Sequence, residues 1–161
     1  RVEGVPLWPE WSEDPEVDVP HGHVALQPIG AKLGAREWSG FAALAERIER
    51  PVVWYGGPGQ EDALARRMPR GGRRCAGLPL PALGAAIRRA AVWVSIDTGP
   101  AHFARACGVP AVCVHSETYA RRSGPCGAIS VEPLVSKAGI AASEAPVEDV
   151  LLAIQRVEAL S

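Results

Sequence analysis

Residues 92–102 read Val-Trp-Val-Ser-Ile-Asp-Thr-Gly-Pro-Ala-His. The first five residues are almost continuously apolar, which is typical of a strand that is covered on both faces of a parallel sheet. Thr98 is a residue type that favours the N-cap of a helix. The stretch therefore predicts a buried strand that delivers Asp97 to its carboxyl end, followed directly by a helix.

The same alternation runs through the rest of the chain. From Val24 onward, short apolar runs alternate with segments of helical period, and this order predicts a parallel sheet with helices packed on it. We therefore expect an α/β fold with a doubly wound, mostly parallel, Rossmann-like sheet. Its expected strands are Val24–Gln27, Pro51–Tyr55, Arg73–Ala76, Val92–Ile96, Ala111–His115 and Ala128–Val131.

Three helices are expected from apolar residues that repeat at helical spacing. The clearest is the last, with Pro146 at its first position and Glu148 and Asp149 in its first turn, where they complement the helix dipole. The apolar positions expected to face the core are Trp38, Phe41, Ala45 and Ile48 in one helix, Leu80, Leu83, Gly84 and Ile87 in another, and Val147, Val150, Leu151, Ile154 and Val157 in the last.

Size and charge limit the classes of function. The chain has 161 residues, enough for one domain with its own core, and its 17 basic and 18 acidic residues give a formal net charge of -1. This balance argues against a nucleic-acid partner, because nucleic-acid binders concentrate positive charge. No apolar run approaches the roughly 18 residues that span a bilayer, so no integral membrane segment is expected.

The amino-terminal residues differ from the rest in composition. Residues 1–22 hold prolines, carboxylates and two tryptophans without a sustained period, so we expect an extended lead-in or linker there and a single domain over residues 23–161. The chain begins with Arg1 rather than methionine, which suggests a processed or truncated piece of a longer protein. The cysteines lack C-x-x-C spacing, and we interpret them as reduced thiols of a cytoplasmic protein.

Asp97, Thr98, Gly99 and His102 form the strongest candidate site. A helix amino terminus presents free N–H groups and partial positive charge, which suit a diphosphate. Gly99 allows a ligand to approach the backbone, and Asp97 can accept hydrogen bonds from ribose or sugar hydroxyls. His102 lies one helical turn beyond Thr98. Together at one strand end, these residues favour ligand binding over a plain capped helix.

Two further strand-to-helix turns carry candidate residues. The first contains Gly30, Lys32 and Arg36, and either cation could pair with a phosphate. The second, Gly56-Gly57-Pro58-Gly59, matches neither G-x-G-x-x-G nor the P-loop pattern, which weakens the dehydrogenase and P-loop interpretations.

His21 and His23 flank a single glycine with no third metal ligand in view. We interpret both histidines as structural and expect no metal site.

Several short motifs occur in order along the chain. The most specific is Asp-Thr-Gly-Pro-x-His at residues 97–102. It is preceded by Leu26-Gln27-Pro28 with Gly30, by Trp38 with Phe41-Ala42-Ala43-Leu44-Ala45, by Gly56-Gly57-Pro58-Gly59 and by Ala76-Gly77-Leu78. On these motifs, the chain from about Val24 to Gly127 resembles the carboxy-terminal domain of glycosyltransferase family nine, the ADP-heptose:lipopolysaccharide heptosyltransferases.

The resemblance implies one half of a two-domain GT-B enzyme. In such enzymes the carboxy-terminal Rossmann-like domain holds a nucleotide-sugar donor, while the amino-terminal domain binds the acceptor and supplies the catalytic base. Neither a metal nor another cofactor is required. The implied donor contacts are the sugar at Asp97, the diphosphate at Thr98 and Gly99 with His102 nearby, the nucleobase at Leu78, and the ribose at Gln60 or, with one residue of slack, Glu61.

Three positions depart from the family pattern. Arg36 stands where the family has a phosphate-binding lysine, which keeps the charge and adds a bidentate fork. Lys32 stands where a small hydroxyl residue is usual. Glu117 replaces part of the common Gly-Pro-Thr after the fifth strand, and it would place an extra negative charge near a diphosphate.

The leading hypothesis is a domain that binds a sugar nucleotide, most simply an ADP-linked sugar, as the donor half of a heptosyltransferase-like enzyme of lipopolysaccharide biosynthesis. By itself such a chain would bind donor without transferring it, because the acceptor domain is missing. One alternative is a non-catalytic nucleotide-binding or protein-interaction module with the same fold, which Lys32 and Glu117 favour. Another is a different GT-B-type sugar-nucleotide enzyme, such as an epimerase.

Overall fold

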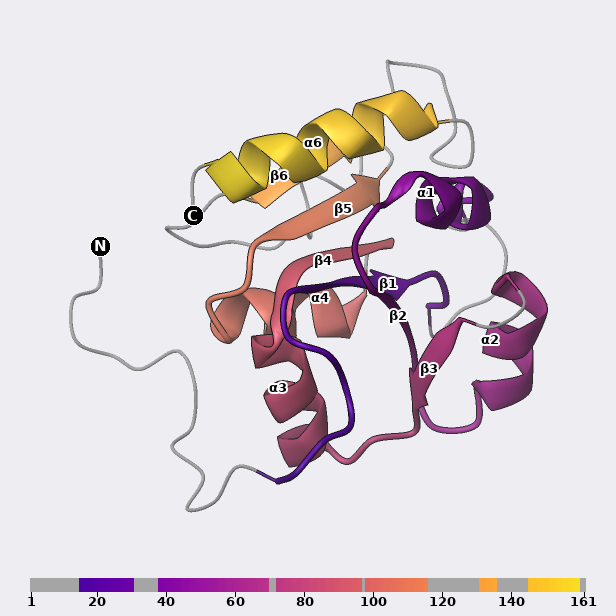
Figure 1. The fold of residues 1–161 in the computed structure, drawn as a ribbon, viewed down its shortest axis with the longest axis vertical. Coiled ribbons are helices and arrows are strands. Elements are labelled where there is room, and N and C mark those ends of the chain that lie inside the picture. Colours follow the sequence, from indigo (N-terminus) through magenta and orange to yellow (C-terminus); the bar gives the residue numbers. More distant parts are fainter. Residues whose placement is uncertain are drawn as a thin grey trace.

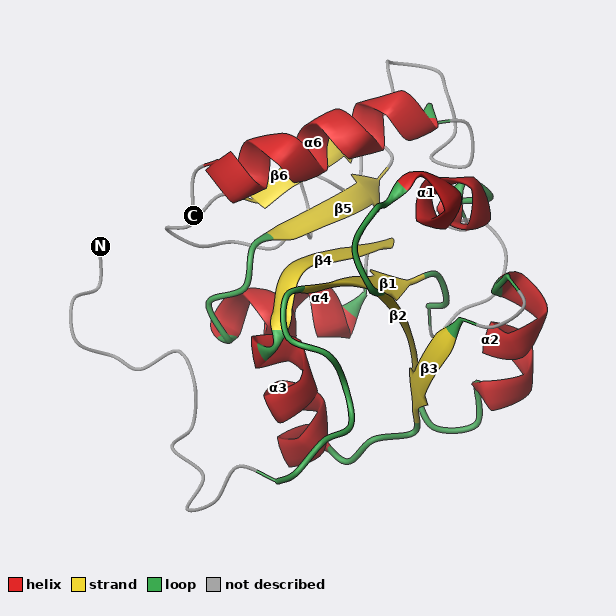
Figure 2. Cartoon of the chain, in the orientation of Figure 1, coloured by secondary structure: helices red, strands yellow, loops and turns green. Residues whose placement is uncertain are grey.

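The computed structural model describes residues 15–30, 38–69, 72–96, 98–115, 131–135 and 145–159. Strands and helices alternate along these parts of the chain, as Figures 1 and 2 show. The strands are β1 (His23–Gln27), β2 (Val52–Gly56), β3 (Arg73–Ala76), β4 (Ala90–Ile96), β5 (Ala111–His115) and β6 (Val131–Val135). The helices are α1 (Phe41–Arg47), α2 (Glu61–Arg67), α3 (Leu80–Arg88), α4 (Gly99–Ala106) and α6 (Val147–Ala159).

The described strands form one parallel sheet in the order β3-β2-β1-β4-β5-β6. This is the strand order of Rossmann-type doubly wound folds, in which successive strands are added first on one side of the central strand and then on the other. The predicted fold class is therefore confirmed. Because every pair is parallel, the carboxyl ends of all these strands lie along one edge of the sheet.

Alternate residues of each buried strand enter two separate cores. In β4, Val92, Val94 and Ile96 pack with α1, α2 and α6, whereas Trp93 packs on the other face with α3 and α4. Both cores are needed because a parallel sheet is apolar on both faces. Figure 1 shows α6 and α1 on one side of the strands and α3 and α4 on the other.

The first five expected strands are confirmed, and the sixth is confirmed at Val131 but continues beyond its expected end. β6 spans Val131–Val135, so the expected Ala128–Val131 shares only Val131 with it, and residues 128–130 lie outside the described residues. Pro133 explains the error, because a proline normally argues against a strand. Here β6 is the edge of the described sheet, where a missing N–H is tolerated.

The apolar spacing predicts the buried residues of α6 better than those of α3. The spacing in α6 is confirmed, because Val150, Ile154 and Val157 are buried, although Pro146 precedes the helix instead of occupying its first position. Leu80 was expected in the core and is 56% exposed. The buried face of α3 is instead made mainly of small residues, Ala82, Gly84, Ala85 and Ala86, with Ile87.

Trp38 is a second correction to the expected helices. It precedes α1 instead of lying on it, and its indole N–H donates to the carbonyl of Ala145 at 2.8 Å. Its ring packs edge-on against Phe41, with 4.9 Å between the centroids. The tryptophan therefore joins α1 to the start of α6 from a position outside either helix.

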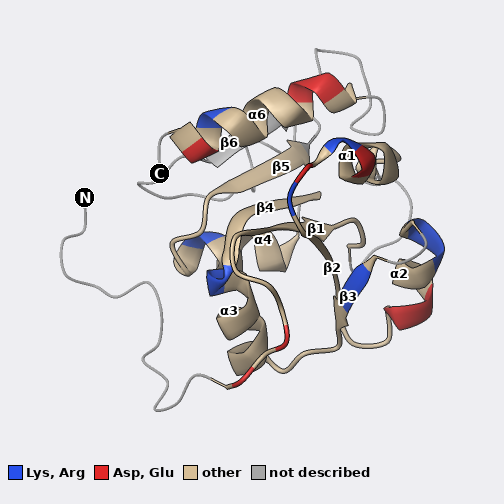
Figure 3. Ribbon diagram, in the orientation of Figure 1, with Lys and Arg blue, Asp and Glu red and all other residues tan. Residues whose placement is uncertain are grey.

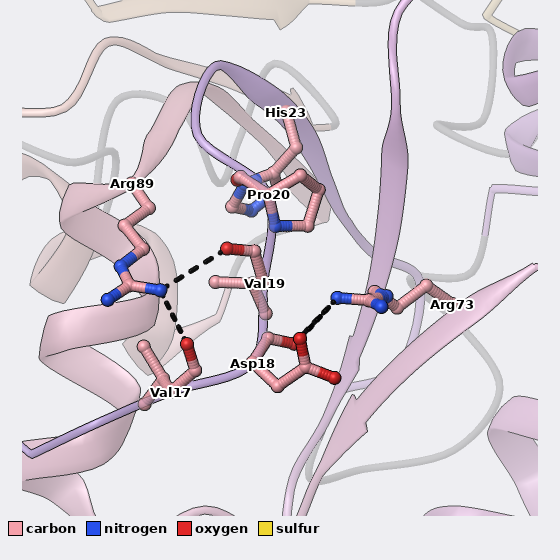
Figure 4. Close-up of polar contacts among 7 residues, drawn as sticks. All are labelled: Val17, Asp18, Val19, Pro20, His23, Arg73 and Arg89. Carbon is pink, nitrogen blue, oxygen red and sulfur yellow. Dashed lines mark hydrogen bonds and ion pairs between the residues drawn. The ribbon is translucent and has the colours of Figure 1, made fainter.

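Residues 15–22, here called the strap, run across the sheet face that carries α3 and end in a turn at His21 and Gly22. Val17 and Val19 are buried in the same core as Tyr55, and they alternate with the exposed residues Glu16 and Asp18. Figure 4 shows how arginines hold the strap's backbone: Arg89 donates to the carbonyls of Val17 and Val19, and Arg73 binds the carbonyl and carboxylate of Asp18 at 2.9 Å. The domain boundary at residue 23 stays a prediction.

His23 connects the strap to the sheet from within β1 and is fully buried. Its Nδ1 lies 2.7 Å from the carbonyl of Pro20, and its Nε2 lies 2.9 Å from the hydroxyl of Tyr55. A carbonyl can only accept, so Nδ1 carries the proton and Nε2 accepts from Tyr55. Burial lowers the pKa of His23 and raises that of the Tyr55 hydroxyl, which keeps both groups neutral.

None of the helices in the described parts of the chain is long and apolar enough to cross a membrane.

We predict that Val19→Ala lowers the free energy of unfolding by about 2 kcal/mol, because it removes buried methyl groups and leaves a cavity over Tyr55. Denaturant unfolding followed by circular dichroism measures the change. Glu16→Ala, at an exposed position of the same strap, is the control and should shift the value by less than about 0.5 kcal/mol. Equal effects would mean that the strap does not contribute to the core.

We also predict that stability falls as the pH drops below about 6.5, the ordinary pKa of histidine. The pKa of His23 is lower in the folded chain, so the unfolded chain binds more protons in that range, and acid favours unfolding. His23→Gln should flatten this part of the profile of unfolding free energy against pH. Burial is the main cause of the lowered pKa of His23 and repulsion by His21 is a smaller one, so His21→Gln should change this slope much less than His23→Gln does.

Candidate functional site

The carboxyl ends of β1, β2 and β4 meet because β1 lies between the other two strands. The turn after β1 approaches the start of α4 closely. A Cβ placed on Gly30 would lie 3.4 Å from the Ile96 side chain and 3.7 Å from Cγ2 of Thr98. The structure thus brings together two residues that were expected in the site from turns about 70 positions apart in the sequence.

Thr98 occupies the N-cap position of α4 as expected, but its hydroxyl does not cap the helix. It donates instead to Oε1 of Gln27, at 2.5 Å. Gln27 is the last residue of β1 and is only 5% exposed, so its amide oxygen needs a donor from the protein. As a result, the threonine hydroxyl connects two strand ends and leaves the helix terminus free of a side-chain cap.

Gly99 and His102 begin α4 and are both exposed. A Cβ added to Gly99 would meet no described atom within 4 Å, so the space beside this backbone is open. A helix start carries partial positive charge from its N–H groups, and an anion placed there is stabilised. This terminus can therefore receive an anionic group.

Gln60 ties the glycine-rich turn to the turn after β1. Its Oε1 accepts from the N–H of Gly57 at 2.8 Å, and its Nε2 donates to the carbonyl of Gly30 at 3.3 Å. Gly59 has a φ of 76°, a left-handed conformation that glycine adopts without strain. The turn is therefore a tight connection that places Gln60 between β1 and β2.

Glu61 lies against the turn that follows β3. Gly77 has a φ of 68°, its N–H donates to the carbonyl of Gly56 at 3.1 Å, and a Cβ on it would lie 2.9 Å from Oε1 of Glu61. The Glu61 carboxylate therefore lies over the turn that leads into half-buried Leu78. A Cβ at residue 77 would make the end of the flexible Glu61 side chain move aside.

The remaining expected site residues lie outside the described residues. These are Asp97, Lys32 and Arg36. Glu117, which follows β5 in the sequence, also lies outside the described residues. Their roles stay predictions.

Figure 3 shows the charge of the described helices: α2 begins with Glu61 and Asp62 and ends with Arg66 and Arg67, the distribution that a helix dipole favours.

The described residues contain no group of three His, Cys, Asp or Glu side chains that could hold a metal ion. They also contain Gln27, which belongs to the Leu26-Gln27-Pro28 motif but was not among the expected site residues. A polar residue at the end of an otherwise apolar strand is the signal that would have found it, since a buried amide requires partners.

Comparisons with known proteins agree on one family. A model of glycosyltransferase family 9 (heptosyltransferase) matches residues 12–141. A family 9 glycosyl transferase from Veillonella parvula DSM 2008 has a similar structure, with a TM-score of 0.72 and 22% identity over 91% of this chain and 48% of that one. The ADP-heptose lps heptosyltransferase II of E. coli also has a TM-score of 0.72, with 19% identity over 86% of this chain and 47% of the other.

A more distant structure is the iron-containing dodecameric glycosyltransferase TibC from enterotoxigenic E. coli H10407. Its TM-score is 0.56, with 17% identity over 83% of this chain and 36% of that one. No curated protein matches the sequence. The chain spans about half the length of the first two structures that it resembles.

We predict that Gly77→Ala and Gly59→Ala differ in cost. Both glycines have positive φ, so each alanine should lose about 1 kcal/mol of stability through backbone strain. Gly77→Ala should lose slightly more, by less than about 0.5 kcal/mol, because its Cβ also makes the end of the flexible, exposed Glu61 side chain move aside, whereas a Cβ at Gly59 meets nothing. Chemical denaturation of both variants measures the difference.

Adding Glu61→Ala to each glycine variant isolates the cause. The extra cost of Gly77→Ala should disappear in that background, while the cost of Gly59→Ala should not change. An extra cost that persists without Glu61 would place the carboxylate elsewhere.

Proposed function

Because the chain belongs to glycosyltransferase family 9, the heptosyltransferases, we propose that it binds a nucleotide-diphosphate sugar as the donor half of a GT-B enzyme. The observation that carries the proposal is the uncapped start of α4, where Gly99 borders open space beside Gly30 and Thr98. Ligands of doubly wound folds bind outside the carboxyl ends of the strands, where the strand order reverses. This position lies there, between β1 and β4.

We assign the diphosphate to the α4 terminus. The backbone at Thr98 and Gly99 offers N–H groups and the helix dipole, and exposed His102 lies within the first turn. Lys32 and Arg36 follow the Gly30 turn in sequence and are proposed to neutralise the phosphates. Asp97, which directly precedes Thr98, is proposed to accept hydrogen bonds from the sugar.

For the ribose, the geometry favours Glu61 over Gln60. Both polar atoms of the Gln60 side chain are engaged within the protein, by Gly57 and Gly30. Glu61 is exposed, and its carboxylate lies over the Gly77 turn beside Leu78, the residue proposed to contact the nucleobase. A carboxylate at this place can accept both ribose hydroxyls, with the base on the apolar Leu78 side chain.

The proposed chemistry is sugar transfer with departure of a nucleoside diphosphate. Negative charge develops on the diphosphate as the glycosidic bond breaks, and the α4 terminus with its neighbouring cations would stabilise that charge. The acceptor hydroxyl and the base that deprotonates it are assigned to an amino-terminal domain separate from residues 23–161. The E. coli structure that shares this fold is an ADP-heptose heptosyltransferase, so ADP-heptose is the first donor to test.

We propose a cytoplasmic enzyme of lipopolysaccharide biosynthesis. One observation supports this location: no disulfide joins Cys75 or Cys107 to another described residue, and burial raises the pKa of Cys75 to about 11 and of Cys107 to about 12. Such thiols stay protonated and react slowly near neutral pH. A chain of this kind suits a reducing compartment.

The proposal is tested by calorimetric titration with ADP and with ADP-heptose. We expect binding by the wild-type chain, and we expect Gly99→Ala to raise the Kd for ADP at least about tenfold, because the added methyl occupies the space proposed for the diphosphate. Its unfolding free energy should not fall, since that methyl meets no atom of the described residues within 4 Å. Gln155→Ala, exposed on α6, is the control and should change neither value.

Two results would contradict the proposal. Absence of binding at millimolar ADP and ADP-heptose would remove donor binding altogether. Normal affinity in Gly99→Ala would move the diphosphate away from α4 while leaving nucleotide binding intact.

A further inference from the structure

Gln27 and Gln60 bind two consecutive carbonyls of the turn after β1. Nε2 of Gln27 donates to the carbonyl of Ile29 at 3.0 Å, and Nε2 of Gln60 donates to the carbonyl of Gly30 at 3.3 Å. The two glutamines come from different places, one at the end of β1 and one at the N-cap of α2. The turn is thus held by side chains from two neighbouring strand ends.

The amide oxygens of the same glutamines hold two further segments. Oε1 of Gln27 accepts from the Thr98 hydroxyl at 2.5 Å, and Oε1 of Gln60 accepts from the N–H of Gly57 at 2.8 Å. Each glutamine therefore uses both ends of its amide. Together they connect the Gly30 turn, the glycine-rich turn after β2 and the N-cap of α4.

The orientation of the turn matters for an anion. A carbonyl oxygen that faced a diphosphate would repel it, whereas an N–H group would attract it. The peptide between Ile29 and Gly30 is planar and trans, so turning the Ile29 carbonyl to Gln27 directs the Gly30 N–H the opposite way. The two glutamines keep both carbonyl oxygens hydrogen-bonded to side-chain amides of the protein.

We propose that Gln27 and Gln60 are positioning residues that hold the Gly30 turn and Thr98 in the orientation that accepts a diphosphate. They act through backbone groups and the Thr98 hydroxyl and do not touch the ligand. The inference rests on the proposed function, and it assigns to Gln60 a role other than ribose contact.

The test compares two ligands in Gln60→Met, a neutral change of similar volume that removes both hydrogen bonds. Binding of ADP is measured by calorimetry and binding of adenosine by NMR titration at millimolar concentration. We expect the Kd for ADP to rise about tenfold and the Kd for adenosine to change less than twofold, because the turn is proposed to face only the phosphates. Gln155→Met on α6 is the matched control and should alter neither Kd.

Gln27→Met is the second variant. It should also weaken ADP more than adenosine, with a larger loss of unfolding free energy, because it leaves the Thr98 hydroxyl and the Ile29 carbonyl without a buried partner. If Gln27→Met does not fold, Gln60→Met decides the question alone, since Gln60 is only partly buried.

The outcomes separate the two proposals. Equal weakening of ADP and adenosine in Gln60→Met would overturn positioning and indicate direct ribose contact or general damage. Unchanged affinity for both ligands would overturn it as well. Failure of the wild-type chain to bind ADP would overturn the proposed function and this inference with it.

Discussion

The parallel pairing of β1 with both β2 and β4 is the constraint on which the rest of the structure depends. It brings three carboxyl ends to one edge, so the turns that follow them must share the space above the sheet. It also reverses the direction of winding, which sends α1 and α2 to one face and α3 and α4 to the other. Packing of both cores and assembly of the candidate site therefore follow from one central strand.

Much of the fold could be predicted because apolar periodicity records burial directly. The strand of residues 92–96 and the helix at the carboxyl end follow that rule closely. The predictions fail where a residue type or its spacing does not match the burial or the pairing that the residue has in the structure. Leu80 lies at an apolar helical position and is exposed, because α3 packs mainly through small alanines, and Pro133 belongs to a strand because an edge strand does not need its N–H.

The candidate site was predictable as a set of turns but not as a set of contacts. Thr98 and Gly99 could be placed at a helix start from residue type alone, whereas the partner of the Thr98 hydroxyl depends on a strand about 70 residues away. The choice between Gln60 and Glu61 also needed three-dimensional information, because only the structure shows that the amide of Gln60 is already engaged. Asp97, Lys32 and Arg36 remain predictions from sequence.

The contacts around the strap respond differently to acid. Arg73 and Arg89 bind backbone carbonyl oxygens at Asp18 and Val17, and such oxygens do not titrate. His23 also binds a carbonyl, that of Pro20, through Nδ1, whereas its Nε2 accepts from the Tyr55 hydroxyl only while the ring is neutral. Acidification therefore acts on the contact between His23 and Tyr55 and leaves the bonds to the strap's carbonyls in place.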